Sequence, residues 1–205
     1  MSKDYKSHIL ATTTQAAELM VNNNRGFIRT AVSDLTIDSN DIWVGPRNIL
    51  EHDSNYKHII PYIVIKQDGK YLTYMRTSSG GESRLHGNMS IGFGGHIDVG
   101  DIVTKNKNQQ IDFIATIINS AKRELEEELS LMADNIKLLG LLYDDSNSVG
   151  MVHIGIALLV EVDCDLIIKS PEDQINLVGF EFVSDIRENS GAYENWSALL
   201  LDGDI

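Results

Sequence analysis

One long amphipathic helix is predicted in the middle of the chain, and it constrains the fold more than any other feature. Between Asp112 and about Leu131, aliphatic residues recur at three- and four-residue intervals, which is typical of a helix that buries one face. On a helical wheel at about 100° per residue, Glu124, Glu127 and Glu128 lie on one side of this apolar stripe. Glu126 lies on the other side. The helix must therefore pack against other elements with three carboxylates beside the contact.

Strands are predicted on both sides of this helix. An Asp-Gly pair at positions 68 and 69 separates two β-rich runs, which is a strong signal for an antiparallel hairpin. The order of elements predicts a mixed α/β (α+β) protein, with one mixed β-sheet sandwiched between helices. The predicted strands are residues 59–66, 70–76, 138–144, 152–162 and 175–183, and a last helix is predicted at 193–201.

Residues 1–55 are polar and rich in Asn, Asp and Ser. They are predicted to form an N-terminal extension or small subdomain ahead of a domain over residues 56–205. Within them we expect a short helix at 14–21 and extended pieces at 27–32 and 42–44.

The composition excludes several classes of partner. The 205 residues include 30 acidic and 17 basic side chains, a formal net charge of -13. Such a chain repels phosphate backbones and anionic lipids on average, so neither a nucleic-acid nor a membrane partner is expected. The chain lacks both a signal-peptide pattern and an apolar run of about 18–20 residues, and its single cysteine, Cys164, fits a reducing compartment. We therefore expect a cytoplasmic protein.

A glycine-dense segment precedes the helix, with Gly92, Gly94, Gly95 and Gly100 within nine residues. Such density indicates backbone in unusual conformations or in close contact with another group. Together, the stretches GGHIDVGD and RELEEEL resemble the signature of the Nudix hydrolases, G-x5-E-x7-R-E-U-x-E-E-x-G-U, where U is a bulky aliphatic residue.

The resemblance covers residues 95–131. Gly95 takes the place of the first glycine and Asp101 that of the first glutamate, while Glu127 and Glu128 match the paired glutamates. The other matching positions are Arg123, Glu124, Leu125 and Leu131.

The chain departs from the signature in three ways. Position 101 is an aspartate, and Ser130 replaces a glycine that would favour a left-handed helix end. Moreover, 21 residues separate Asp101 from Arg123 where the signature has seven, so 14 are inserted. The segment Thr104–Gln110 contains no aliphatic residue and is predicted to be a mobile surface loop. Lys105 and Lys107 either keep this loop soluble or close over the phosphates of a substrate.

The resemblance implies a Nudix fold and hydrolysis of a diphosphate linkage in a nucleotide or nucleoside diphosphate derivative. It implies Mg²⁺ or Mn²⁺ as cofactor, because hard cations prefer oxygen ligands and neutralise charge on the diphosphate. Glu127 and Glu124 would act in catalysis with Arg123, which orients a glutamate. The implied metal ligands are Glu124, Glu127, Glu128, Asp101 and the carbonyl of Gly95.

Positive side chains near the glycine-dense segment are candidates to bind the phosphates of a small-molecule substrate. These are Arg76, Arg84 and His96. A structural, hydrogen-bonded role is the alternative for His96. Aromatic side chains either stack on a base or pack in the core, namely Tyr74, Phe93 and Trp196. A homodimer is compatible with the sequence, which does not identify the substrate.

Other functions remain open. A non-catalytic nucleotide-sensing or regulatory module on a Nudix fold is favoured by the departures from the signature, whereas the intact glutamates favour an enzyme. An isomerase on the same scaffold would need a dedicated acid pair. Glu127 is the first candidate for the general base. Outside the signature, the candidates are Asp144, Asp145, Glu161, Glu172 and Glu181.

Overall fold

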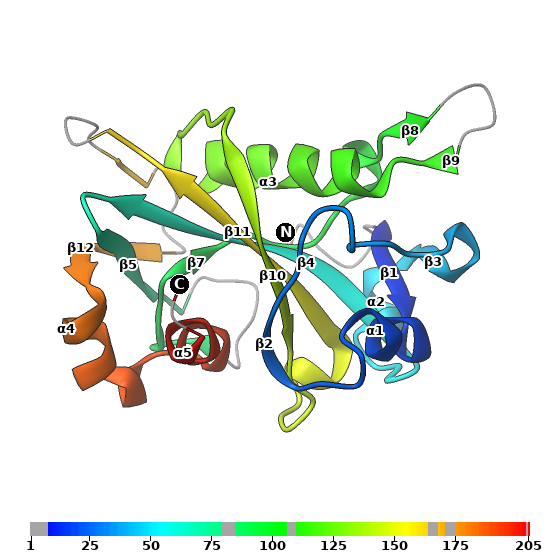
Figure 1. The fold of residues 1–205 in the computed structure, drawn as a ribbon, viewed down its shortest axis with the longest axis horizontal. Helices are drawn as coiled ribbons and strands as arrows, with labels where there is room; N and C mark the ends of the chain where they lie inside the picture. The colour runs from blue at the N-terminus through cyan, green and yellow to red at the C-terminus, as the bar shows by residue number, and fades with distance from the viewer. Residues whose placement is uncertain (1–7, 79–84, 106–109, 164–167, 171–174, 204) are drawn as a thin grey trace.

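A mixed β-sheet forms the centre of the protein (Figure 1). The computed structural model describes residues 8–78, 85–105, 110–163, 168–170, 175–203 and 205. The long strand β4 (Tyr56–Gln67) lies in the middle, antiparallel to β5 (Lys70–Arg76) and parallel to β11 (His153–Glu161). The main strand order is β12-β5-β4-β11-β10-β2, with β12 (Ile175–Phe182), β10 (Ile136–Tyr143) and β2 (Gly26–Arg29).

Shorter strands complete the sheet. Strand β1 (His8–Thr13) pairs with both β3 (Ile42–Pro46) and β4. Strand β6 (Met89–Ser90) pairs with β5, and β7 (Gly92–Phe93) pairs with β4. The predicted hairpin is confirmed, because Asp68 and Gly69 both have positive φ, 48° and 78°, as a two-residue turn between twisted strands requires.

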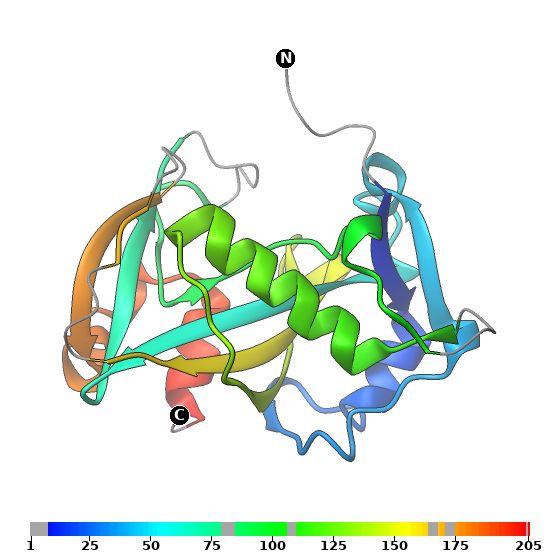
Figure 2. The same ribbon diagram turned by 90° about the horizontal axis from the view of Figure 1, so that it is seen from above.

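Helix α3 (Phe113–Leu129) is the predicted amphipathic helix, and it crosses one face of the sheet (Figure 2). It begins after Asp112, whose side chain accepts a hydrogen bond from the amide of Ala115 at 3.3 Å. It ends at Ser130, which has φ 51° and donates its N–H to the carbonyl of Glu126. The left-handed helix end is therefore kept without glycine, at a cost of about 1 kcal/mol.

Side chains alternate between the two faces of β4 and supply two cores. Ile63 and Ile65 pack in the core beneath α3, whereas Tyr62 and Val64 pack on the opposite side with α5 (Asn195–Asp202). The predicted arrangement, a mixed sheet between helices, is confirmed. The remaining α-helices are α1 (Thr14–Met20), α2 (Arg47–Leu50) and α4 (Val183–Glu188), and single 3-10 turns occupy Ser39–Asp41, Val99–Asp101, Gly150–Val152 and Ser190–Ala192. Among the described residues, no helix has both the length and the apolar character needed to cross a membrane.

The N-terminal residues join the main sheet and core. Strand β1 pairs with β4, β2 pairs with β10, and Leu10, Ala17 and Val21 are buried in the core beneath α3. A domain boundary at residue 55 stays a prediction.

The inserted segment begins and ends as a small hairpin. Strand β8 (Thr104–Lys105) pairs with β9 (Gln110–Ile111), so the two ends of the predicted surface loop are paired strands, whereas its predicted mobility stays a prediction. Backbone pairing needs no buried apolar surface, which is why the polar composition did not reveal it. The Lys105 ammonium lies 3.5 Å from the carboxylate of Asp112, and Lys107 lies outside the described residues.

Candidate active site

Two consecutive glycines bring the backbone against the glutamates of α3. Gly94 has φ 140°, and a Cβ there would lie 2.0 Å from the carbonyl oxygen of Pro61, so only glycine fits. Its amide donates to Oε2 of Glu128 at 3.3 Å. A Cβ on Gly95 would lie 2.8 Å from Oε1 of Glu124. Two of the three glutamates of the expected metal site, Glu124 and Glu128, therefore lie against Gly94 and Gly95.

Glu124 is the most buried of the three glutamates, with 8% of its surface exposed. Burial raises its pKa to about 7, although Arg123 acts in the opposite direction. Its Oε1 atom lies 2.9 Å from Nη1 of Arg123. Because Glu124 carries only part of its charge near neutral pH, a nearby cation would stabilise its ionised form.

Arg123 connects the helix, the acids and the glycine segment. Its Nε and Nη2 atoms each donate to one carboxylate oxygen of Asp101 at 2.9 Å. Nη2 also donates to the carbonyl of His96 at 2.9 Å, and Nη1 donates to Glu127 at 3.0 Å. Burial opposes its charge, yet Asp101, Glu124 and Glu127 outweigh burial and raise the pKa of Arg123. Arg123 therefore stays positively charged and holds Asp101, Glu127 and the backbone at His96 together.

Asp101 is the main ion-pair partner of Arg123. It is 3% exposed, and its Oδ2 also accepts the amide of Asp98 at 2.9 Å. Both oxygens are thus bonded within the protein, unlike the arrangement expected of a metal ligand. Glu127, by contrast, has 53% of its side chain exposed, and Glu126 is exposed on the other side of α3 as predicted.

Of the three predicted phosphate-binding residues, the structure describes Arg76 and His96. The guanidinium carbon of Arg76 lies 5.5 Å from the ring centroid of Tyr74, and its buried Nε has no hydrogen-bond partner among the described residues. Burial opposes its charge, but Tyr74, Glu194 and Glu128 outweigh it and raise the pKa of Arg76. His96 turns its ring toward His58. Arg84 lies outside the described residues.

Core packing explains two of the three candidate stacking residues. Tyr74 and Phe93 are fully buried, with ring centroids 4.6 Å apart. Trp196 is half-buried and contacts Tyr62 edge-on at 5.6 Å.

Four of the five acids proposed outside the signature are described by the structure, and each has a structural partner. Glu161 pairs with Lys137, Glu181 accepts the hydroxyl of Tyr193, and Asp145 pairs with Arg25, while Asp144 accepts the side chains of Ser146, Asn147 and Asn195. Glu172 lies outside the described residues.

Sequence reasoning missed His58 and His153, which lie beside His96. His58 lies near the start of β4 and His153 is the first residue of β11, and the two are direct partners in the parallel register of these strands. The only sequence signal is that each histidine stands at the start of an apolar run, which does not reveal the pairing.

Comparisons with known proteins bear on the fold. The fold resembles that of Tm1382, a putative Nudix hydrolase, with a TM-score of 0.75, 23% identity, and coverage of 95% of this chain and 96% of Tm1382. It also resembles a Nudix hydrolase from Alicyclobacillus acidocaldarius, with a TM-score of 0.52, 12% identity, and coverage of 71% and 90%. No family model matches the chain.

The likeness to Tm1382 over nearly the whole chain, together with the glycine segment and the glutamates of α3, identifies a protein with the Nudix fold. In sequence, the chain is 34% identical to protein YmaB of Bacillus subtilis strain 168 over 161 residues, which covers 76% of this chain and 75% of YmaB. The chain belongs to the family of YmaB.

Proposed function

We propose that this protein is a metal-dependent hydrolase that cleaves a diphosphate linkage in a nucleotide or nucleoside diphosphate derivative. One observation carries the proposal: α3 presents Glu124 and Glu128 to the backbone of Gly94 and Gly95, with Glu127 one turn from Arg123. The Nudix fold supports the same reaction class, although fold alone does not determine function.

The donor set fits Mg²⁺ or Mn²⁺. Glu124, Glu127 and Glu128 offer carboxylate oxygens beside the carbonyl of Gly95, and hard divalent cations select oxygen donors. The raised pKa of Glu124 is consistent with a site that gains stability from added positive charge. Bound there, the cation would neutralise diphosphate charge and acidify a water molecule. We assign Asp101 to holding Arg123 and leave it out of the ligand set.

The chain's own residues then have distinct tasks. Arg123 fixes the orientation of Glu127 and of the backbone at His96, which keeps the ligands in place. Glu127 is our candidate for the group that accepts a proton from water, because it is the most exposed of the three glutamates. Arg76 is our candidate to bind a phosphate, since the N–H of its buried Nε donates to none of the described residues.

A substrate panel tests this proposal. Phosphate and nucleotide products are measured for nucleoside diphosphate derivatives and nucleotides, with Mg²⁺, with Mn²⁺, and with a chelator. We expect cleavage of at least one diphosphate only when metal is present. Tight nucleotide binding without any cleavage would instead support the sensing module, and cleavage that persists in chelator would contradict the metal site.

A further inference from the structure

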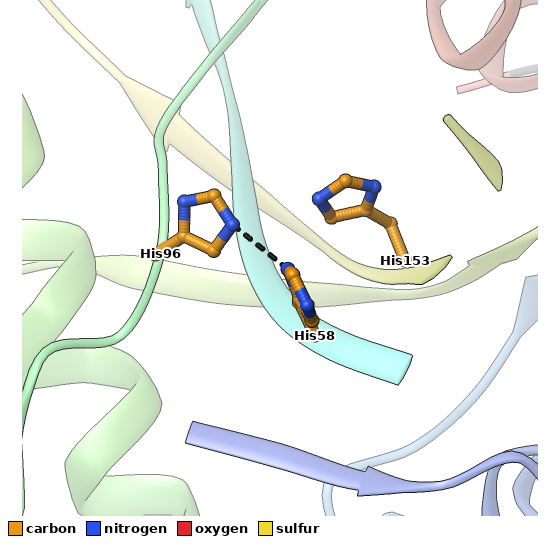
Figure 3. Close-up of side chains that lie close together, drawn as sticks. All are labelled: His58, His96 and His153. Carbon is orange, nitrogen blue, oxygen red and sulfur yellow. Dashed lines mark hydrogen bonds between the residues drawn. The ribbon is translucent and has the colours of Figure 1, made fainter. Parts of the chain in front are cut away.

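Three histidines from three separate segments meet beside the carboxylate site (Figure 3). His58 is the third residue of β4, His153 is the first residue of β11, and His96 follows the two glycines. Nδ1 of His58 lies 3.0 Å from Nε2 of His96, and one nitrogen from each of the three rings lies within 4.8 Å of the others. His58 and His153 are 0% and 6% exposed.

We propose that His58, His96 and His153 form a second metal site, which binds a divalent transition metal of the zinc class. Three neutral imidazoles with an open fourth position are a common zinc donor set. Nitrogen donors favour zinc-class ions over Mg²⁺, whereas carboxylates favour Mg²⁺ and Mn²⁺. The two sites therefore differ in metal preference although they share the segment from Gly94 to His96.

The geometry is close to what such an ion requires. Tetrahedral ligation at about 2.0–2.1 Å places ligand nitrogens about 3.3 Å apart. The His58 and His96 nitrogens are already at 3.0 Å, and one nitrogen of each ring lies within 4.8 Å of the others, so an ion would need to draw the rings closer by at most about 1.5 Å. In Figure 3 the ring of His153 points one nitrogen toward the other two histidines.

A hydrogen bond orients His153 for this role. Its Nδ1 lies 2.7 Å from the carbonyl oxygen of Val149, so Nδ1 carries the proton and Nε2 carries the lone pair. Metal-binding histidines commonly donate their second ring nitrogen to a carbonyl in this way.

The electrostatic surroundings are compatible with an added cation. Burial is the main cause that lowers the pKa of His58 to about 3 and that of His96 well below its usual value, so both rings are neutral at pH 7. Arg47 and Arg123 also act on His96, but each is paired with a carboxylate that offsets its charge: Glu51 lies 2.6 Å from Arg47, and Asp101 lies 2.9 Å from Arg123.

Zn²⁺ and Co²⁺ titrations test the second site. The protein is first freed of bound metal and then placed in excess Mg²⁺, which occupies the carboxylates. Zn²⁺ binding is measured by calorimetry and Co²⁺ binding by visible absorption. We expect one equivalent of each ion per chain and the intense absorption of tetrahedral Co²⁺. The double substitution Glu127→Gln and Glu128→Gln should retain this equivalent. Absence of Zn²⁺ binding in excess Mg²⁺, or its loss in the double variant, overturns the second site.

Single substitutions assign the ligands. His58→Gln, His96→Gln and His153→Gln should each weaken Zn²⁺ by more than about 100-fold. His52→Gln is the matched control, since His52 is exposed and lies outside the cluster. Circular dichroism checks that each variant folds. If His58→Gln and His153→Gln unfold because they lie within strands, His96→Gln decides the test, since His96 lies in a half-exposed segment between strands. Unchanged Zn²⁺ affinity in folded His96→Gln means that the histidines form only a structural cluster.

Discussion

Arg123 and Asp101 form a bidentate ion pair that spans 22 positions of the sequence and closes the inserted segment. Side-chain exposure is 27% for Arg123 and 5% for Asp101, so the pair is largely shielded from water. In such a pair, removing one charge leaves the other buried without its partner.

Asp101→Asn should therefore destabilise the protein by about 3 kcal/mol, measured by urea unfolding. Asp134→Asn is the control, because Asp134 is fully exposed and pairs with Lys122 at 2.9 Å. We expect the control to leave the free energy of unfolding nearly unchanged, because water screens an exposed ion pair. Equal effects in the two variants would mean that the Asp101 pair is not structurally important.

Glu127→Gln should lower metal-dependent turnover by several orders of magnitude, since the substitution removes a charge but keeps the shape. Glu126→Gln makes the same chemical change on the adjacent residue, which is exposed on the other side of α3. Its kcat and KM should match those of the unmodified protein. Full activity in Glu127→Gln would remove Glu127 from the mechanism.

Gly95→Ala should weaken Mg²⁺ or Mn²⁺ binding by about tenfold or more, because the new Cβ would lie 2.8 Å from Oε1 of Glu124 and displace that carboxylate. Gly100→Ala serves as the control, since a Cβ there meets nothing within 4 Å. Metal affinity is measured by calorimetry. Equal affinities in the two variants would show that Glu124 need not approach Gly95.

Metal binding should strengthen as pH rises toward 7 and level off above it. The pKa of Glu124 is raised from 4.5 to about 7 in the folded, metal-free protein, so below pH 7 the cation must displace a proton. Calorimetry in buffers of different ionisation enthalpy measures this proton release. Glu124→Gln should abolish it, and a pH-independent affinity in the unmodified protein would contradict the raised pKa.

The raised pKa of Glu124 also determines the direction in which pH changes the stability of the metal-free protein. Because the folded protein holds the Glu124 proton more tightly than the unfolded chain does, this group's stabilising contribution is complete below pH 4.5 and is lost as pH rises to about 7. Glu124→Gln removes this contribution to the pH dependence of unfolding without metal.

Lys105→Gln should leave kcat and KM unchanged, because Lys105 is 56% exposed and makes a 3.5 Å pair with Asp112. A raised KM with unchanged metal dependence would favour the alternative in which this segment closes over phosphates.

Local patterns predicted much of the fold. The periodicity of α3 and the Asp-Gly turn each specify structure over a few neighbouring residues, so both were predicted close to their observed bounds. The position of Glu124 beside Gly95 was also predicted, because the resemblance to the Nudix signature links the two segments.

Long-range pairings could not be predicted in the same way. The meeting of His58 with His153 depends on the parallel register of β4 and β11, which no local pattern encodes. The role of Asp101 depends on how the inserted residues fold back toward Arg123. Ser130 shows a third limit: packing of Leu129 and Leu131 holds a left-handed helix end that propensity alone disfavours.

The small hairpin at the insertion has a practical consequence. The amide of Asp112 donates to the carbonyl of Val103 at 2.7 Å, and the amide of Val103 donates to the Thr116 hydroxyl at 3.0 Å. The chain thus leaves and re-enters the fold at nearly one point. Because the entropy of closing a loop grows slowly with its length, residues 104–111 offer a place to graft a fluorescent or affinity domain at the N-terminal end of α3, the opposite end from the glutamates, while the spacing within RELEEEL stays intact.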